Sequence, residues 1–157
     1  MMTVRLPQLG GCVCGRVRYR LTAAPLLAYA CHCHDCQKRS GSAFGLTVVV
    51  RSADVLFKGE MDLVRLPTPS GRNVEQNLCP TCRCRIYAQA AEARDFLSLR
   101  AGSLDQTDWV IPVVQTWTQS ALPWALIPGV RHLPQEEFDF VALGREWQAW
   151  APKFVTD

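Results

Sequence analysis

Alternating apolar and polar residues mark the clearest elements of the chain. Residues 16–21 alternate strictly, with arginine at every even position and an apolar or aromatic residue between them, which is the pattern of a strand with one buried face. Leu46–Val50 is rich in β-branched residues and predicts a fully buried strand. The pattern therefore predicts a mainly β protein, with four further short strands at Val55–Phe57, Leu63–Leu66, Arg85–Gln89 and Phe96–Leu99.

The remaining segments predict turns and one helix. Pro67–Asn73 is rich in turn-forming residues, and Ser103–Trp109 fits a turn or a single helical turn. Glu136–Trp150 predicts a short helix, although Gly144 weakens it. We find neither a repeat nor a linker, and predict one domain over residues 1–130 with a C-terminal extension, residues 131–157, packed on it.

Composition and charge exclude several classes of protein. A chain of 157 residues is long enough to bury one hydrophobic core. It has no stretch of 18 or more apolar residues, so we expect no membrane partner. The net charge of +3 is too small to indicate a nucleic-acid partner. Met1–Gly10 has no apolar core segment, so we expect no secretory signal and a cytoplasmic location.

Eight cysteines in three short clusters are the unusual feature of the composition. Four disulfides are one interpretation, but disulfide frameworks usually scatter their cysteines and belong to oxidising compartments. Redox activity and inert buried thiols are further alternatives. We favour metal binding, because clustered thiolates are soft ligands that select zinc. The clusters are Cys12 and Cys14; Cys31, Cys33 and Cys36; and Cys79, Cys82 and Cys84.

The spacings predict two different metal sites. The CxxC of Cys79 and Cys82 is a usual half of a closed zinc site, and the CxC of Cys12 and Cys14 is a natural second half. Such a site would be structural, because the energy of metal binding becomes folding energy.

The middle cluster has three thiols within six residues, which fits a catalytic zinc with an open fourth position. A rival partition gives two closed sites with Cys84 as the eighth ligand. The neighbouring His32 and His34 could also coordinate, but we expect them to face solvent or to lie behind the ligands.

With these residues in view, the sequence resembles the glutathione-dependent formaldehyde-activating (centromere protein V-like) family. The resemblance covers about residues 8–125 and rests on GGCVCGRVRY at 10–19, CHCHDCQKRSGSAFG at 31–45, LCPTC at 78–82 and the segment Trp117–Trp124. It implies an Mss4-like β-tent of antiparallel sheets organised around zinc. It also implies that the first and third clusters hold the structural ion through Cys12, Cys14, Cys79 and Cys82, and that Cys31, Cys33 and Cys36 hold the catalytic ion.

Two residues depart from the family pattern. Glycine commonly follows the CxxC, where a left-handed turn suits a residue without a Cβ. Arg83 stands there instead, so the turn is either strained or built differently. Cys84 is additional to the seven-cysteine pattern and has no assigned role.

The open site predicts thiol chemistry. Three thiolates make zinc a weak Lewis acid, but a thiol entering the fourth position would be deprotonated and stay nucleophilic. We therefore expect a carbon–sulfur lyase-type enzyme that joins a small thiol to an aldehyde, and the resemblance implies glutathione and formaldehyde. The alternatives are a non-catalytic zinc scaffold and a redox-responsive zinc protein. For most of the five tryptophans we expect core or interface packing rather than pocket lining, and Trp147 with Trp150 could instead form a homodimer patch.

Overall fold

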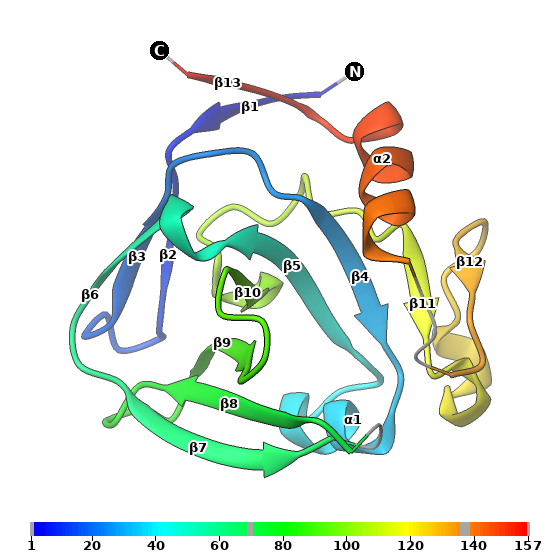
Figure 1. Ribbon diagram of the computed structural model, residues 1–157, viewed down its shortest axis with the longest axis horizontal. Helices are drawn as coiled ribbons and strands as arrows, with labels where there is room; N and C mark the ends of the chain where they lie inside the picture. The colour runs from blue at the N-terminus through cyan, green and yellow to red at the C-terminus, as the bar shows by residue number, and fades with distance from the viewer. Residues whose placement is uncertain (1, 69–70, 136–138, 157) are drawn as a thin grey trace.

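One curved eight-stranded sheet and two smaller sheets surround the core of the protein (Figure 1). The computed structural model describes residues 2–68, 71–135 and 139–156. Most neighbouring strands are antiparallel, and β11 lies parallel to both β4 and β12. The order of the large sheet is β12 (Arg131–His132), β11 (Val114–Thr116), β4 (Leu27–Cys31), β5 (Gly45–Arg51), β10 (Phe96–Arg100), β9 (Arg85–Ala90), β8 (Asn73–Leu78) and β7 (Asp62–Pro67).

The two smaller sheets flank the large one. Three antiparallel strands form one of them, and the other pairs the first and last strands of the chain in parallel (Figure 1). Because β13 pairs with β1, the end of the chain is held against its beginning. The strands are β2 (Gln8–Gly11), β3 (Arg18–Leu21) and β6 (Val55–Lys58) in the first, and β1 (Thr3–Leu6) with β13 (Lys153–Thr156) in the second.

The mainly β prediction is confirmed, and the predicted strands are present with small changes at their ends. In and beside β3 the alternation acts as expected, since Val17, Tyr19 and Leu21 are buried and Arg20 is exposed. In β5 the residues Val48–Val50 are all buried between neighbours on both sides. Residues 69 and 70 of the turn predicted before β8 lie outside the described residues.

The predicted C-terminal helix is present over a shorter range. Helix α2 (Phe140–Trp150) begins after Asp139, whose Oδ1 accepts hydrogen bonds from two backbone N–H groups of the first turn, at 2.9 and 3.1 Å. Residues 136–138, where the prediction began, lie outside the described residues. Trp147 is only 1% exposed whereas Trp150 is 40% exposed. The two tryptophans therefore do not form a shared exposed patch.

Short helical segments connect the strands. Helix α1 (His34–Ser40) follows β4, and a 3-10 turn just precedes the predicted Ser103–Trp109 turn. Within the described residues, neither α-helix has the length and apolar character needed to cross a membrane. The 3-10 turns are η1 (Ser52–Asp54), η2 (Ala101–Ser103), η3 (Thr118–Ser120) and η4 (Pro123–Ala125).

Candidate functional site

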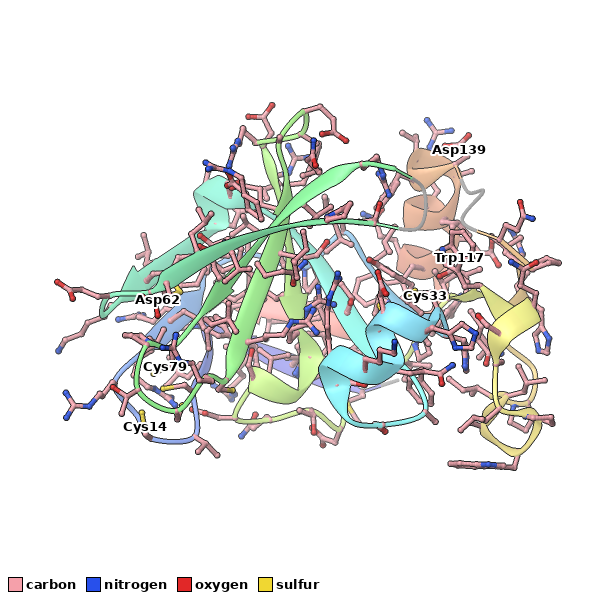
Figure 2. All side chains as sticks on the ribbon, turned by 90° about the horizontal axis from the view of Figure 1, so that it is seen from below. Cys14, Cys33, Asp62, Cys79, Trp117 and Asp139 are labelled. Atoms are coloured by element: carbon pink, nitrogen blue, oxygen red, sulfur yellow. The ribbon has the colours of Figure 1, made fainter. Side chains whose placement is uncertain are left out.

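Four cysteine thiols meet where two strands end. Cys12 and Cys14 follow β2, and Cys79 and Cys82 follow β8. The four Sγ atoms lie within 4.8 Å of one another, and Sγ of Cys14 is 3.5 Å from that of Cys12 and 3.6 Å from that of Cys79. Thiolates around one tetrahedral zinc ion at ~2.3 Å lie about 3.8 Å apart. The donor type and the spacing both fit zinc, and Figure 2 shows Cys14 and Cys79 beside each other.

Arg83 completes the turn of this first cluster in a left-handed conformation, with φ at 62°. Its N–H donates to the carbonyl of Cys79 at 3.0 Å, and the N–H of Cys79 donates to the carbonyl of Cys84 at 3.0 Å. The guanidinium forms an ion pair with Asp62. The left-handed conformation strains a residue that has a Cβ. Of the two alternatives left by the missing glycine, the strained turn is therefore the one observed.

Cys84 lies outside both thiol clusters. It is partly buried, its Sγ is 3.9 Å from the carbonyl oxygen of Arg85, and burial raises the pKa of its thiol. It joins no group of metal-ligating atoms within the described part of the chain. The geometry therefore does not bring Cys84 to Cys31, Cys33 and Cys36 as a fourth ligand.

Three further thiols meet where β4 passes into α1. Cys31 ends β4, Cys33 caps the N-terminus of α1, and Cys36 lies in its first turn. Sγ of Cys33 accepts a hydrogen bond from the N–H of Cys36 at 3.3 Å, so a cysteine does what Ser or Asp usually does at a helix start. The three Sγ atoms lie within 4.8 Å of one another, with no fourth side-chain ligand among the described residues. Three soft donors in this arrangement fit a zinc ion with an open position.

The three thiols of this second cluster differ in acidity. Contacts with the sulfurs of Cys31 and Cys33 lower the pKa of the Cys36 thiol to about 3, and the charges of Arg100 and Arg85 act in the same direction. Contacts with the sulfurs of Cys33 and Cys36, together with burial, raise the pKa of Cys31. Of the three thiols, that of Cys36 is therefore the one most readily deprotonated.

The two neighbouring histidines behave differently from each other. His34 is exposed, as expected for a residue facing solvent. His32 is fully buried, and its Nε2 lies 3.2 Å from Oε1 of Gln115. Its carbonyl accepts hydrogen bonds from Nε2 of Gln37 at 2.8 Å and from Oγ of Ser120 at 3.1 Å. Neither histidine joins a cluster of ligating atoms, and His32 instead fixes the turn between the ligands.

A cavity of about 650 Å³ opens beside the second cluster. Cys31, Cys33 and Cys36 line it, whereas no cysteine of the first cluster does. Cavities of this size accept small-molecule substrates. Figure 2 shows Cys33 and Trp117 close together, well away from Cys14 and Cys79. The walls are largely aliphatic and aromatic, and include Leu27, Val49, Val74, Phe96 and Val141.

The sequence profile described as glutathione-dependent formaldehyde-activating enzyme matches residues 8–120, a span that holds both clusters. The chain belongs to this family. No curated protein matches it. A crystal structure of a Rhodobacter sphaeroides protein is similar over 79% of this chain and 98% of that one, with 18% sequence identity and a TM-score of 0.49. The mainly β fold with its two thiol clusters is consistent with the Mss4-like fold.

The place of Trp117 in the wall of the cavity was not predicted from the sequence. Core or interface packing was expected for most of the tryptophans, without a distinction among them, and Trp117 lines the cavity. Its backbone is left-handed, with φ at 56°. Outside glycine, only Arg83 shares this property in the described chain. A bulky residue held in this conformation is strained, and periodicity gives no signal of it.

Two arginines beside the second cluster were also missed. Nη1 of Arg100 donates to Oγ1 of Thr47 at 3.0 Å, and Nη2 of Arg85 donates to Oε1 of Gln76 at 2.9 Å. Burial, with repulsion from Arg100, lowers the pKa of Arg85 to about 9. Both residues sit at strand ends, where an arginine normally reaches solvent, so nothing in the local pattern distinguishes them.

Proposed function

We propose that this family member is a zinc-dependent carbon–sulfur lyase-type enzyme that joins a small thiol, glutathione, to formaldehyde or another aldehyde. The observation that carries the proposal is the position of the second cluster. Cys31, Cys33 and Cys36 line the cavity of about 650 Å³, whereas the first cluster lines no part of it. A small molecule can therefore reach the second cluster.

The two clusters take different roles in this proposal. Cys12, Cys14, Cys79 and Cys82 hold a structural zinc ion that ties β2 to the end of β8. The second cluster holds a second, exchangeable ion. A zinc ion with three thiolate ligands supplies an open position that stabilises a substrate thiol in its nucleophilic thiolate form.

The reaction forms one bond and moves one proton. The substrate sulfur, after losing its proton to solvent, gives an electron pair to the carbonyl carbon. The carbon–oxygen π pair moves to the oxygen, which takes a proton from water, so the step needs neither oxidant nor reductant. The cavity walls around Leu27, Val49 and Phe96 hold the two reactants together and limit competing hydration of the aldehyde.

Free thiols in two clusters indicate a reducing compartment. We therefore place the protein in the cytoplasm, where glutathione keeps such thiols reduced and is itself available as the substrate.

The proposal is tested by the rate of exchange between free glutathione and its hydroxymethyl adduct, followed by exchange NMR against the protein-free rate. The zinc-loaded protein should accelerate the exchange. Cys36→Ser should abolish the acceleration and keep the fold, because its removal disrupts only the open cluster. Cys84→Ser is the matched control, a partly buried cysteine outside both clusters, and should keep both activity and fold.

Four results would count against the proposal. The wild-type protein could leave the exchange rate unchanged, or Cys36→Ser could retain full acceleration. If Cys36→Ser unfolds, both metal ions are structural and the scaffold alternative holds. Release of zinc by mild peroxide without any acceleration of exchange would favour the redox alternative.

A further inference from the structure

Two half-buried arginines without a carboxylate partner lie beside the second cluster. Among the described residues, neither Arg85 nor Arg100 forms an ion pair, and the Nε atom of each is buried without a hydrogen-bond partner. Each guanidinium is instead held by one neutral side chain, Gln76 for Arg85 and Thr47 for Arg100. Partial burial without a carboxylate partner carries a cost, so negative charge at the neighbouring cluster stabilises the two guanidiniums.

Gly45 brings Arg100 and the sulfur of Cys36 to the same place. Gly45 begins β5 beside the cluster and is buried. A Cβ placed on it would lie 3.7 Å from Sγ of Cys36 and 4.0 Å from Nη1 of Arg100. The sulfur and the guanidinium therefore lie next to the same bare stretch of backbone, and Arg100 itself lines the cavity.

The charges near the cluster do not balance without a bound anion. Three thiolates and one divalent zinc ion carry a net charge of −1, whereas Arg85 and Arg100 carry +2. The nearby Arg39 is paired with Asp35 at 3.5 Å and adds no net charge. No aspartate or glutamate of the described chain lines the cavity. The basic residues that line it are Arg39, Arg51, Arg72, Arg100 and Arg145.

A neutral ligand at the open position leaves one positive charge in surplus, and an anionic ligand removes it. We propose that Arg100, with Arg85 behind it, is the specificity-determining residue that makes this pocket take its sulfur substrate as the thiolate. The inference rests on the proposed function and adds to it a ligand class, anionic sulfur in preference to water, alcohols or neutral nitrogen ligands. On binding, the thiol releases its S–H proton to solvent.

The role of Arg100 can be measured without catalysis. Protein loaded with cobalt(II) is titrated with 2-mercaptoethanol, which carries no charge apart from its sulfur, and separately with imidazole as a neutral ligand. Binding is read from the visible and near-ultraviolet cobalt spectrum. The four-thiolate site is saturated and should not respond. Arg51→Gln is the matched control, because Arg51 lines the same cavity at the far end of β5.

Arg100→Gln should weaken binding of 2-mercaptoethanol by roughly 30- to 50-fold, from one charge at about 7–8 Å with an effective dielectric constant of about 20. The same substitution should change the affinity for imidazole by less than about twofold, because a neutral ligand has no charge to interact with that of Arg100. Arg51→Gln should leave both affinities within about twofold. Arg100→Lys keeps the charge, so it should bind the thiol within a few-fold of wild type, and it keeps the test open if the glutamine variant does not fold.

Equal weakening of both ligands by Arg100→Gln, or no weakening of either, would overturn the role of Arg100. A tenfold loss of thiol binding in Arg100→Lys would do the same. If the wild-type spectrum responds to neither ligand, the open site is absent and the proposed function fails together with this inference. Charge-selective thiol binding without acceleration of aldehyde exchange would leave the role of Arg100 intact and contradict the proposed reaction alone.

Discussion

The strained turn at Arg83 gives a prediction that separates backbone strain from side-chain pairing. Arg83→Ala removes the ion pair with Asp62 and keeps a Cβ in the left-handed conformation. Arg83→Gly removes the same ion pair and also the strain. The two variants therefore differ only in the free energy of the backbone conformation at residue 83.

The magnitudes follow from the exposure and the dihedral angle. The Arg83 and Asp62 side chains are 66% and 46% exposed, so their ion pair contributes about 0–1 kcal/mol. The left-handed conformation costs a residue with a Cβ roughly 1–2 kcal/mol, and Arg83→Gly relieves this strain. The greater freedom of glycine in the unfolded chain offsets about 0.5–1 kcal/mol of that relief. Arg83→Gly should therefore be more stable than Arg83→Ala by about 0.5–1 kcal/mol.

Calorimetric melting of the zinc-loaded variants, at one fixed zinc concentration, measures this difference. For a chain of this size the Gly variant should melt roughly 1–4 °C above the Ala variant. Asp62→Ala is the control, because it removes the ion pair and leaves the backbone of the turn unchanged, and it should match Arg83→Ala. Equal melting temperatures of the Gly and Ala variants would refute the strain, and a more stable Ala variant would do so more strongly.

Two further predictions concern the fold around the site. The hydrogen-bonded charge of Arg94, joined by that of Arg65, lowers the pKa of Glu75 from 4.5 to about 2. Because the pKa of Glu75 is lower in the folded state than in the unfolded chain, this stabilisation is present above pH 4.5 and is lost as the pH falls toward 2. The melting temperature of wild type should therefore exceed that of Glu75→Gln above pH 4.5, and the difference should disappear as the pH falls toward 2. A difference that stays constant over this range would contradict the pairing. Gly10→Ala should destabilise the fold by about 1–3 kcal/mol in urea unfolding, because its Cβ would lie 2.3 Å from Cζ of Tyr19. Gly102→Ala is the control and should be close to neutral, because a Cβ on Gly102 would meet no atom within 4 Å.

The strands that the sequence predicted are those with an unambiguous local pattern. The alternating residues up to Leu21 and the β-branched run in β5 each become buried once a strand lies on either side. Both segments have such neighbours, and their apolar residues are buried. Strand β4 was missed because its residues Leu27–Cys31 form a short apolar run without alternation, which fits a helix equally well. Its pairing with β11, more than 80 residues away, depends on the whole sheet.

The same division applies to the candidate site. Cysteine spacing predicted two groups of thiols, because ligands one to three residues apart can reach one ion from a single turn, but it left the place of Cys84 open. The cavity was not visible in the sequence, since its lining comes from strands and two helices that are distant along the chain. The uncompensated charges of Arg85 and Arg100 were hidden for the same reason: whether an arginine reaches solvent is decided by tertiary packing.

The central claim is that the protein holds one closed and one open thiolate metal site. It is tested most directly by the zinc content of purified wild type and Cys36→Ser, measured together with their far-ultraviolet circular dichroism. The account predicts about two zinc ions per chain in wild type, and about one in Cys36→Ser with an unchanged spectrum. One zinc ion in wild type, two in the variant, or loss of both ions together with the fold would contradict it.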